Sequence, residues 1–186
     1  MTNCPTLETE RLVLRPFTED DLDELAALNA TPEVRRSLRL PDPAGRPPTV
    51  GRDDAWTSMA LWLGQWALRG TGQWALEEKA TGAFVGRAGL HHPGREGWPG
   101  TEVGWALHPS HWGRGYATEA GARSLEYAFE LLGLDRICSV ILPDNQRSQA
   151  VARRLGLRFT EERILSHYPD EPHGIWWITA EEWGSR

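Results

Sequence analysis

The stretch SHWGRGYATEAG, residues 110–121, constrains the fold most, because two glycines separate an expected strand from an expected helix. The preceding TEVGWALHP alternates like a strand, and the following GYATEAGARSLEYAFELLG has the pattern of a helix that ends at Gly133. Glycines let backbone N–H groups converge, and a helix N-terminus carries roughly half a positive charge. The junction therefore predicts a phosphate or pyrophosphate site, although a glycine-rich turn without a ligand has the same local sequence.

The N-terminal third predicts a strand, two helices and a loop. RLVLRPF (11–17) alternates as a strand, and TEDDLDELAALNA follows with Thr18 as N-cap and leucines at helical spacing. Residues 39–54 hold many prolines and glycines and are expected to form a loop. The next segment, up to residue 70, has a helical pattern with Trp62 and Trp66 four positions apart on one face.

The rest of the chain predicts a meander followed by alternating helices and strands. GQWALEEKATGAFVGRAGLHH contains two apolar runs around a Gly-containing turn, which is typical of a β-hairpin, and TEVGWALHP adds a third strand. After the helix that ends at Gly133 come the strand RICSVIL, the short helix NQRSQAVARRLG and strand-like runs near 157–166 and 174–179. The order β-α-α-β-β-β-α-β-α-β-β predicts a mixed-sheet α+β or α/β domain.

Length and charge narrow the class of protein. The 186 residues suit a single domain, and 20 basic against 26 acidic residues, with no basic block, argue against nucleic acid as a partner. The net charge of -6 suits a cationic substrate such as an amine, and equally an ordinary soluble protein. Cys4 and Cys138 form neither a disulfide framework nor a zinc site. Without a signal sequence or an apolar run of ~20 residues, we expect a cytoplasmic protein that needs no metal and contacts no membrane.

The ten tryptophans gather at residues 56–112 and 176–183. Such side chains fill a core more often than they line a pocket, and both roles are open here.

Two familiar phosphate-binding loops fit the junction poorly. A Walker loop requires a lysine after its glycines, and none follows here. A dinucleotide fingerprint requires a small residue where Thr118 stands, and its acidic residue would be Asp135, which precedes the next strand instead of ending it. A nucleotide-dependent oxidoreductase is therefore a distant hypothesis.

A third loop fits better. Residues 112–117 resemble the acyl-CoA loop of the GNAT N-acetyltransferases, Gln/Arg-x-x-Gly-x-Gly/Ala, with Trp112 in the first place. EVGWALHPSHWGRGYATEA resembles the form found in ribosomal-protein alanine N-acetyltransferase-like members, and DNQRSQAVARRLGLRF (144–159) resembles their second CoA-side motif, with Leu157 where phenylalanine is usual. LETERLVLRPFTEDDLDEL is similar to their opening strand and helix. The resemblance covers residues 7 to 179.

The resemblance implies one GNAT domain over 7–180, with a central, mostly antiparallel sheet and flanking helices, and acetyl-CoA as co-substrate. It places the pyrophosphate on the backbone N–H groups of the loop, with the pantetheine arm against the free edge of the preceding strand and Asn145 on its amides. The residues that it assigns to acetyl-CoA are Trp105, Ala106, Leu107, Trp112, Gly113, Arg114, Gly115, Tyr116, Ala117, Thr118, Asn145 and Ser148.

Transfer to an amine requires a neutral nitrogen and a proton for the departing thiolate. The resemblance places Ser148 beside the sulfur as proton donor. Asn145 and Ser148 could equally be helix-capping residues, and Tyr168 or Tyr127 could replace Ser148 as donor.

Two side chains are candidates for the base. His167 has a reference pKa of about 6.5, which suits it to accept a proton at neutral pH, although it could be only a surface loop residue. Glu102 is the alternative and would need burial to raise its pKa to match.

The acceptor amine is expected between the early helices and the last strands, and it could be a protein N-terminus or a small molecule. A GNAT-fold protein that binds acyl-CoA without turnover is the other function class, suggested by Trp112 at the loop entrance. A homodimer is possible through exposed strand edges or tryptophans.

Overall fold

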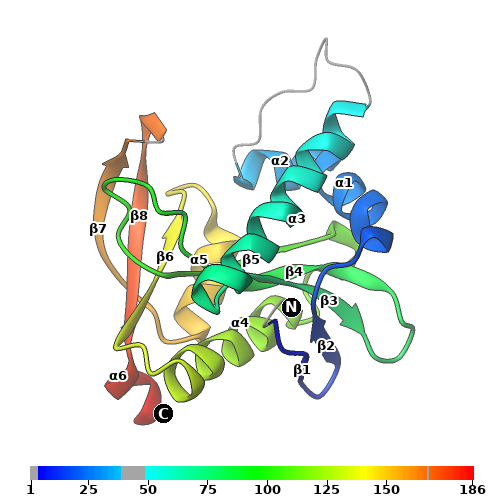
Figure 1. The fold of residues 1–186 in the computed structure, drawn as a ribbon. Helices are drawn as coiled ribbons and strands as arrows, with labels where there is room; N and C mark the ends of the chain where they lie inside the picture. Colours follow the sequence, from blue (N-terminus) through cyan, green and yellow to red (C-terminus); the bar gives the residue numbers. More distant parts are fainter. Residues whose placement is uncertain (1–3, 39–48, 167) are drawn as a thin grey trace.

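A computed structural model describes residues 4–38, 49–166 and 168–186. Their strands form one sheet in the order β1-β2-β3-β4-β5-β6-β8-β7. All neighbouring strands run antiparallel except β5 and β6, which are parallel. The mostly antiparallel mixed sheet expected from the resemblance is therefore confirmed (Figure 1).

The elements follow the sequence patterns closely in the second half of the chain. The strands are β1 (Leu7–Glu8), β2 (Leu12–Arg15), β3 (Gln73–Glu78), β4 (Phe84–His91), β5 (Glu102–Leu107), β6 (Arg136–Ile141), β7 (Arg158–Leu165) and β8 (Tyr168–Thr179). The helices are α1 (Leu22–Ala30), α2 (Pro32–Leu38), α3 (Thr49–Arg69), α4 (Tyr116–Glu126), α5 (Gln146–Arg154) and α6 (Ala180–Gly184). The helix expected to continue to Gly133 instead widens after α4 into a π-helical turn, Tyr127–Leu131.

Several expectations in the first half were incomplete. The loop predicted for 39–54 is wrong over residues 49–54, which already belong to α3, while 39–48 lie outside the described residues. No proline interrupts the helix after Pro48, and the hydroxyls of Thr57 and Ser58 donate to the carbonyls four positions earlier, as helical geometry allows. The short elements β1, α2 and α6 were not predicted at all.

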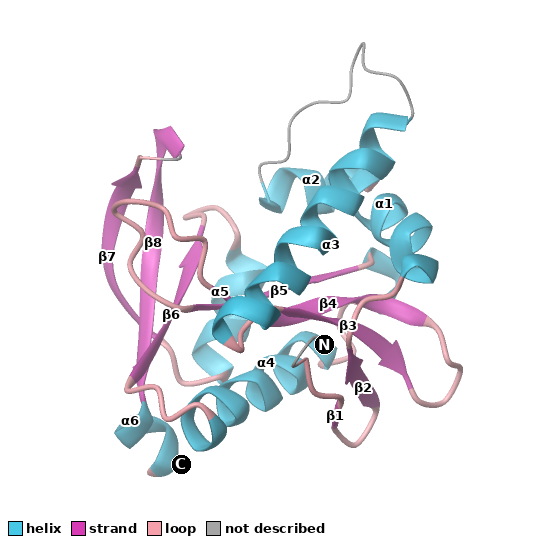
Figure 2. Ribbon diagram, viewed as in Figure 1, coloured by secondary structure: helices cyan, strands magenta, loops and turns pink. Residues whose placement is uncertain are grey.

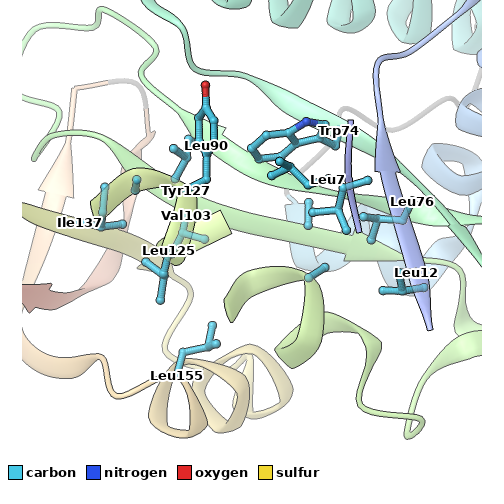
Figure 3. Packing of buried hydrophobic residues seen from close by; sticks show 14 of the residues in the cluster. Leu7, Leu12, Trp74, Leu76, Leu90, Val103, Leu125, Tyr127, Ile137 and Leu155 are labelled. Carbon is cyan, nitrogen blue, oxygen red and sulfur yellow. The ribbon is translucent and has the colours of Figure 1, made fainter. Parts of the chain in front are cut away.

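Helices cover both faces of the sheet. Figure 2 shows α1 to α3 on one face and α4 on the other. The α4 face holds the larger core, in which Leu76, Leu90, Val103 and Leu125 are fully buried (Figure 3). The opposite face packs α1 and α3 on the sheet through a second cluster that includes Phe17 and Trp62. Helix α3 thus lies over β3, β4 and β5, and residues of α3 line one wall of a cavity between this helix and the sheet.

The tryptophans divide between core and cavity walls. Trp62, Trp66, Trp74 and Trp176 are buried, as expected for core packing. Trp105 and Trp112 are half-buried and line a groove. Among the described helices none is long and apolar enough to span a membrane.

Candidate active site

The junction after β5 has the backbone geometry that a phosphate cradle needs. Gly113 and Gly115 have φ angles of 75° and 83°, which favour glycine, and Gly115 is the N-cap of α4. A Cβ added at Gly113 would meet no atom within 4 Å, so the loop leaves open space beside its backbone. The first N–H groups of α4 face no helical partner and can bind an anion.

The side chains around this loop are held by contacts of their own. Trp112 Nε1 donates to the carbonyl of Leu107 at 2.8 Å, and the guanidinium of Arg147 stacks over the Trp112 ring at 4.4 Å. Trp112 therefore joins the loop to α5, which gives the tryptophan at the loop entrance a structural role. Tyr116 is buried and its hydroxyl donates to Glu78, so only its backbone N–H is available to a ligand.

Strands β5 and β6 separate directly beyond the start of β5. Their only strand pair is Glu102 with Cys138, although β5 continues to Leu107. Within the described chain, the edge of β5 that carries Trp105, Ala106 and Leu107 has no strand partner on this side. Its backbone can therefore pair with an extended ligand, in the way a further strand would.

Helix α5 begins beside this gap. Asn145 is its N-cap, and the Asn145 side-chain oxygen accepts from the backbone N–H of Ser148 at 3.1 Å. The capping role of Asn145 is thus present, but it occupies only the oxygen and leaves the amide NH₂ for a ligand. The Ser148 hydroxyl makes no hydrogen bond within the described part of the chain, so it is not a cap.

Two cavities meet at this point. A groove of about 1340 Å³ runs along the loop, α4 and α5, and it includes every residue assigned to acetyl-CoA from the sequence. A second cavity of about 290 Å³ lies between the sheet and α3. Four residues line both cavities: Ser37, Trp105, Asn145 and Ser148.

Glu102 lines the second cavity. Burial raises the pKa of its carboxyl to about 7, even though its Oε1 accepts from the Val140 N–H at 3.2 Å and the cation of Arg87 favours the charged form. The indole N–H of Trp98 faces the same carboxylate, at a geometry that falls short of a hydrogen bond. Glu102 is half-buried, and its raised pKa is the condition that a glutamate base needs at neutral pH.

The other sequence candidates are placed differently. Tyr168 lines the second cavity and stacks on His173, with ring centroids 4.7 Å apart. Tyr127 is buried in the core, and its hydroxyl donates to the carbonyl of Gly70 at 3.2 Å, away from both cavities. His167 lies outside the described residues, so its candidacy stays a prediction.

Sequence reasoning missed several residues of the second cavity, above all Arg87, Trp98 and His173. Arg87 carried a usable signal, because it is the one long charged side chain within the apolar run AFVGRAGL. The signal points to an unusual buried cation, but not to the cavity that surrounds it.

The family profile described as "Acetyltransferase (GNAT) domain" matches residues 11–158. The chain belongs to the GNAT acetyltransferases. It is an acetyl-CoA-dependent N-acetyltransferase, as its relatives' names also indicate. The resemblance found in the motifs at 112–117 and 144–159 is thus confirmed at the level of the family.

Two relatives and two solved structures illustrate the similarity. The "Uncharacterized N-acetyltransferase YoaA" of Bacillus subtilis is 30% identical over 88% of both chains. The "FsC-acetyl coenzyme A-N(2)-transacetylase" of Aspergillus fumigatus is 33% identical over 96% of this chain and 78% of its own. An acetyltransferase from Agrobacterium tumefaciens has a TM-score of 0.77, 31% identity and 94% coverage of both chains. The ribosomal-protein-S5-alanine acetyltransferase from Vibrio fischeri, at 18% identity and a TM-score of 0.72 over 96% of this chain and 98% of its own, shares the fold.

Proposed function

We propose that this GNAT enzyme acetylates a primary amine by direct attack, with acetyl-CoA in the groove and the amine in the cavity between the sheet and α3. The observation that carries the proposal is the junction of the two cavities at Trp105, Asn145 and Ser148. An acetyl group on a sulfur at this junction would face the second cavity.

The groove has the features that acetyl-CoA requires. The two glycines and the start of α4 offer N–H groups to the pyrophosphate, and the unpaired edge of β5 offers its backbone to the pantetheine arm. Arg114, Arg147 and Arg154 line the same groove and favour an anionic ligand.

In the proposed reaction, Glu102 takes the proton of the incoming ammonium group through a water molecule. The neutral nitrogen then forms a bond to the acetyl carbonyl carbon and becomes positively charged. It loses its second proton to solvent as the bond between that carbon and sulfur breaks, and a neutral amide results. Ser148 donates its hydroxyl proton to the departing thiolate and regains a proton from solvent. A carboxylate with a pKa near 7 is a suitable base at neutral pH, whereas an ordinary glutamate is too weak.

The acceptor can be a protein N-terminal amine or a small molecule, and the volume of about 290 Å³ favours a small one. The cytoplasmic location, the homodimer and a single domain over 7–180 stay predictions from the sequence.

The test is an acceptor screen that combines thiol release from acetyl-CoA with mass spectrometry of the product. On the best acceptor, the wild-type rate should fall below about pH 7, and Glu102→Gln should lose at least about tenfold in rate together with this acidic limb. His167→Ala serves as the rival variant. If neither variant changes the rate or the limb, the amine enters already neutral and no side-chain base operates.

Acetyl-CoA binding without thiol release for any amine would contradict the proposal and favour a binding or sensory protein. Titration calorimetry with acetyl-CoA measures this binding independently of turnover.

A further inference from the structure

Arg87 lines the second cavity, in which we propose that the amine binds and which we call the acceptor cavity, and the proposed reaction does not use Arg87. It extends from β4 on the face that α3 covers. Its guanidinium stacks on the Trp62 ring at 4.9 Å, and Nη1 donates to the Gln73 side-chain oxygen at 2.9 Å. These contacts fix the orientation of the guanidinium and leave most of its donors unused.

The unused donors form one edge of the group. Nε is buried and makes no hydrogen bond within the described chain. The hydrogen bond that the guanidinium makes to Gln73 comes from Nη1, so it leaves Nη2 available. Nε and Nη2 point to the same side of the planar guanidinium, which is the edge that binds a carboxylate through two parallel hydrogen bonds. A buried donor without an acceptor costs free energy until a ligand supplies one.

The groups around Arg87 do not neutralise its positive charge. Burial lowers its pKa only to about 10, so it is a cation at neutral pH. Burial, with the nearby Arg87 charge, lowers the pKa of His91 to about 4, which makes that imidazole neutral, and Arg95 adds a second cation to the lining. Glu102 is the opposing charge that acts on Arg87, yet within the described residues Arg87 forms no ion pair with it or with any other carboxylate. The cavity therefore favours an anionic group beside its base.

We infer that the acceptor is a small amine that also carries a carboxylate, and that the Nε–Nη2 edge of Arg87 binds this carboxylate. The inference rests on the proposed function, because it assumes that the amine occupies this cavity. Arg87 acts here as a specificity residue: it holds the acceptor while Glu102 takes the ammonium proton. A protein N-terminus would continue as a peptide chain and would bring no carboxylate of its own to this edge.

The experiment compares matched acceptors. A series of α-amino and ω-amino acids, from glycine to 6-aminohexanoate, is assayed by thiol release beside the same amines in which a carboxamide replaces the carboxylate. For the wild type we expect kcat/KM to be about 10- to 100-fold higher for at least one acid than for its amide, as the loss of a charge-assisted pair predicts. Arg87→Met should remove this difference by lowering the value for the acid alone.

Two further variants separate recognition from structure. Arg87→Lys keeps the charge without the two-donor edge, and we expect it to restore part of the preference for the acid. Arg153→Met is the matched control, because Arg153 stacks on Trp176 at 5.2 Å outside the acceptor cavity. This variant should leave kcat/KM unchanged for both the acid and the amide. The melting temperature and the acetyl-CoA Kd of each variant establish that it is folded.

Equal kcat/KM for acids and amides in the wild type would overturn the inference, as would an equal loss on both in Arg87→Met. If only neutral or peptide amines are acetylated, the inference fails while the proposed function stands. If no amine of any kind releases thiol, the proposed function fails and the inference falls with it.

Discussion

At the scale of single residues, Ser148 and Glu102 differ in how firmly the structure fixes them. The Ser148 backbone N–H is held by the Asn145 cap, while its hydroxyl has no partner in the described chain. The Glu102 carboxylate accepts a hydrogen bond from the Val140 N–H, and both residues line the second cavity. The Ser148 hydroxyl is therefore free to turn, as its proposed role of proton donor requires, whereas the Glu102 carboxylate is held in place, as its proposed role of base requires.

For Ser148→Ala we expect kcat to fall by about 10- to 100-fold, at the low end for general acid catalysis because a thiolate leaves easily. The Kd of acetyl-CoA should change little, since the hydroxyl acts only as the thiolate departs. Ser148→Cys keeps a transferable proton and should recover part of the rate. Wild-type turnover in Ser148→Ala, measured by thiol release, would show that the hydroxyl has no catalytic role.

Glu102 also predicts how stability depends on pH. Its folded pKa of about 7 lies above the ordinary value of 4.5, so the folded state binds the proton more tightly than the unfolded chain. This contribution to the free energy of unfolding is full below about pH 4.5 and is lost as the pH rises to about 7. Urea unfolding of Glu102→Gln across this range should show a smaller decline with pH than the wild type shows. An identical decline would mean that Glu102 does not titrate as argued.

At the scale of elements, the loop before α4 allows the effect of a glycine substitution on stability to be distinguished from its effect on ligand binding. Gly113 and Gly133 both have positive φ angles, 75° and 62°, and a Cβ at either would meet no atom within 4 Å. Gly113→Ala and Gly133→Ala should therefore each cost about 1–2 kcal/mol of stability through the left-handed backbone. Only Gly113→Ala should weaken acetyl-CoA binding in calorimetry, by about tenfold or more. If both variants bind acetyl-CoA with equal affinity, the loop does not contact acetyl-CoA.

Strand β5 offers a way to block one cavity and spare the other. Gly104 lines the acceptor cavity but not the groove, and a Cβ there would meet nothing within 4 Å. Gly104→Val should fold, because β-branched residues suit strands, and its side chain should occupy space that the acceptor needs. We expect KM for the acceptor to rise about tenfold or more while the Kd of acetyl-CoA stays unchanged. An unaltered KM would place the acceptor elsewhere.

At the scale of the whole molecule, the groove connects parts of the chain that are distant in sequence. Its lining includes residues of α2, β5, α4 and α5, so a ligand in the groove would contact all four elements. A ligand that binds only the folded state raises the free energy of unfolding by about 2.7 kcal/mol at one hundred times its Kd. For a domain of this size we expect a rise in melting temperature of about 5–11 °C with acetyl-CoA. A scan without any rise at saturation would contradict the assignment of the groove.

Local sequence determined the parts of the protein that depend on neighbouring residues. The glycine-rich junction, the meander of β3 to β5, the cap at Asn145 and the helix-ending glycines at 133 and 156 all follow from short-range rules on φ, periodicity and capping. The GNAT motifs at 112–117 and 144–159 lie in such stretches, so the sequence could name residues that line the groove, while their contacts with acetyl-CoA stay a proposal.

Tertiary structure alone formed the cavity in which we propose that the acceptor binds. No local rule places α3 over β4, and it is this packing that sets Trp62 on Arg87. The surroundings that raise the pKa of Glu102 are also formed only in the folded chain. Likewise, β5 and β6 pair at Glu102 and Cys138, which lie 36 positions apart in the sequence, and the two strands separate beyond this pair. Burial and pairing over such distances are properties of the folded chain, and for this reason the sequence named Glu102 as a candidate but could not identify Arg87 as its neighbour.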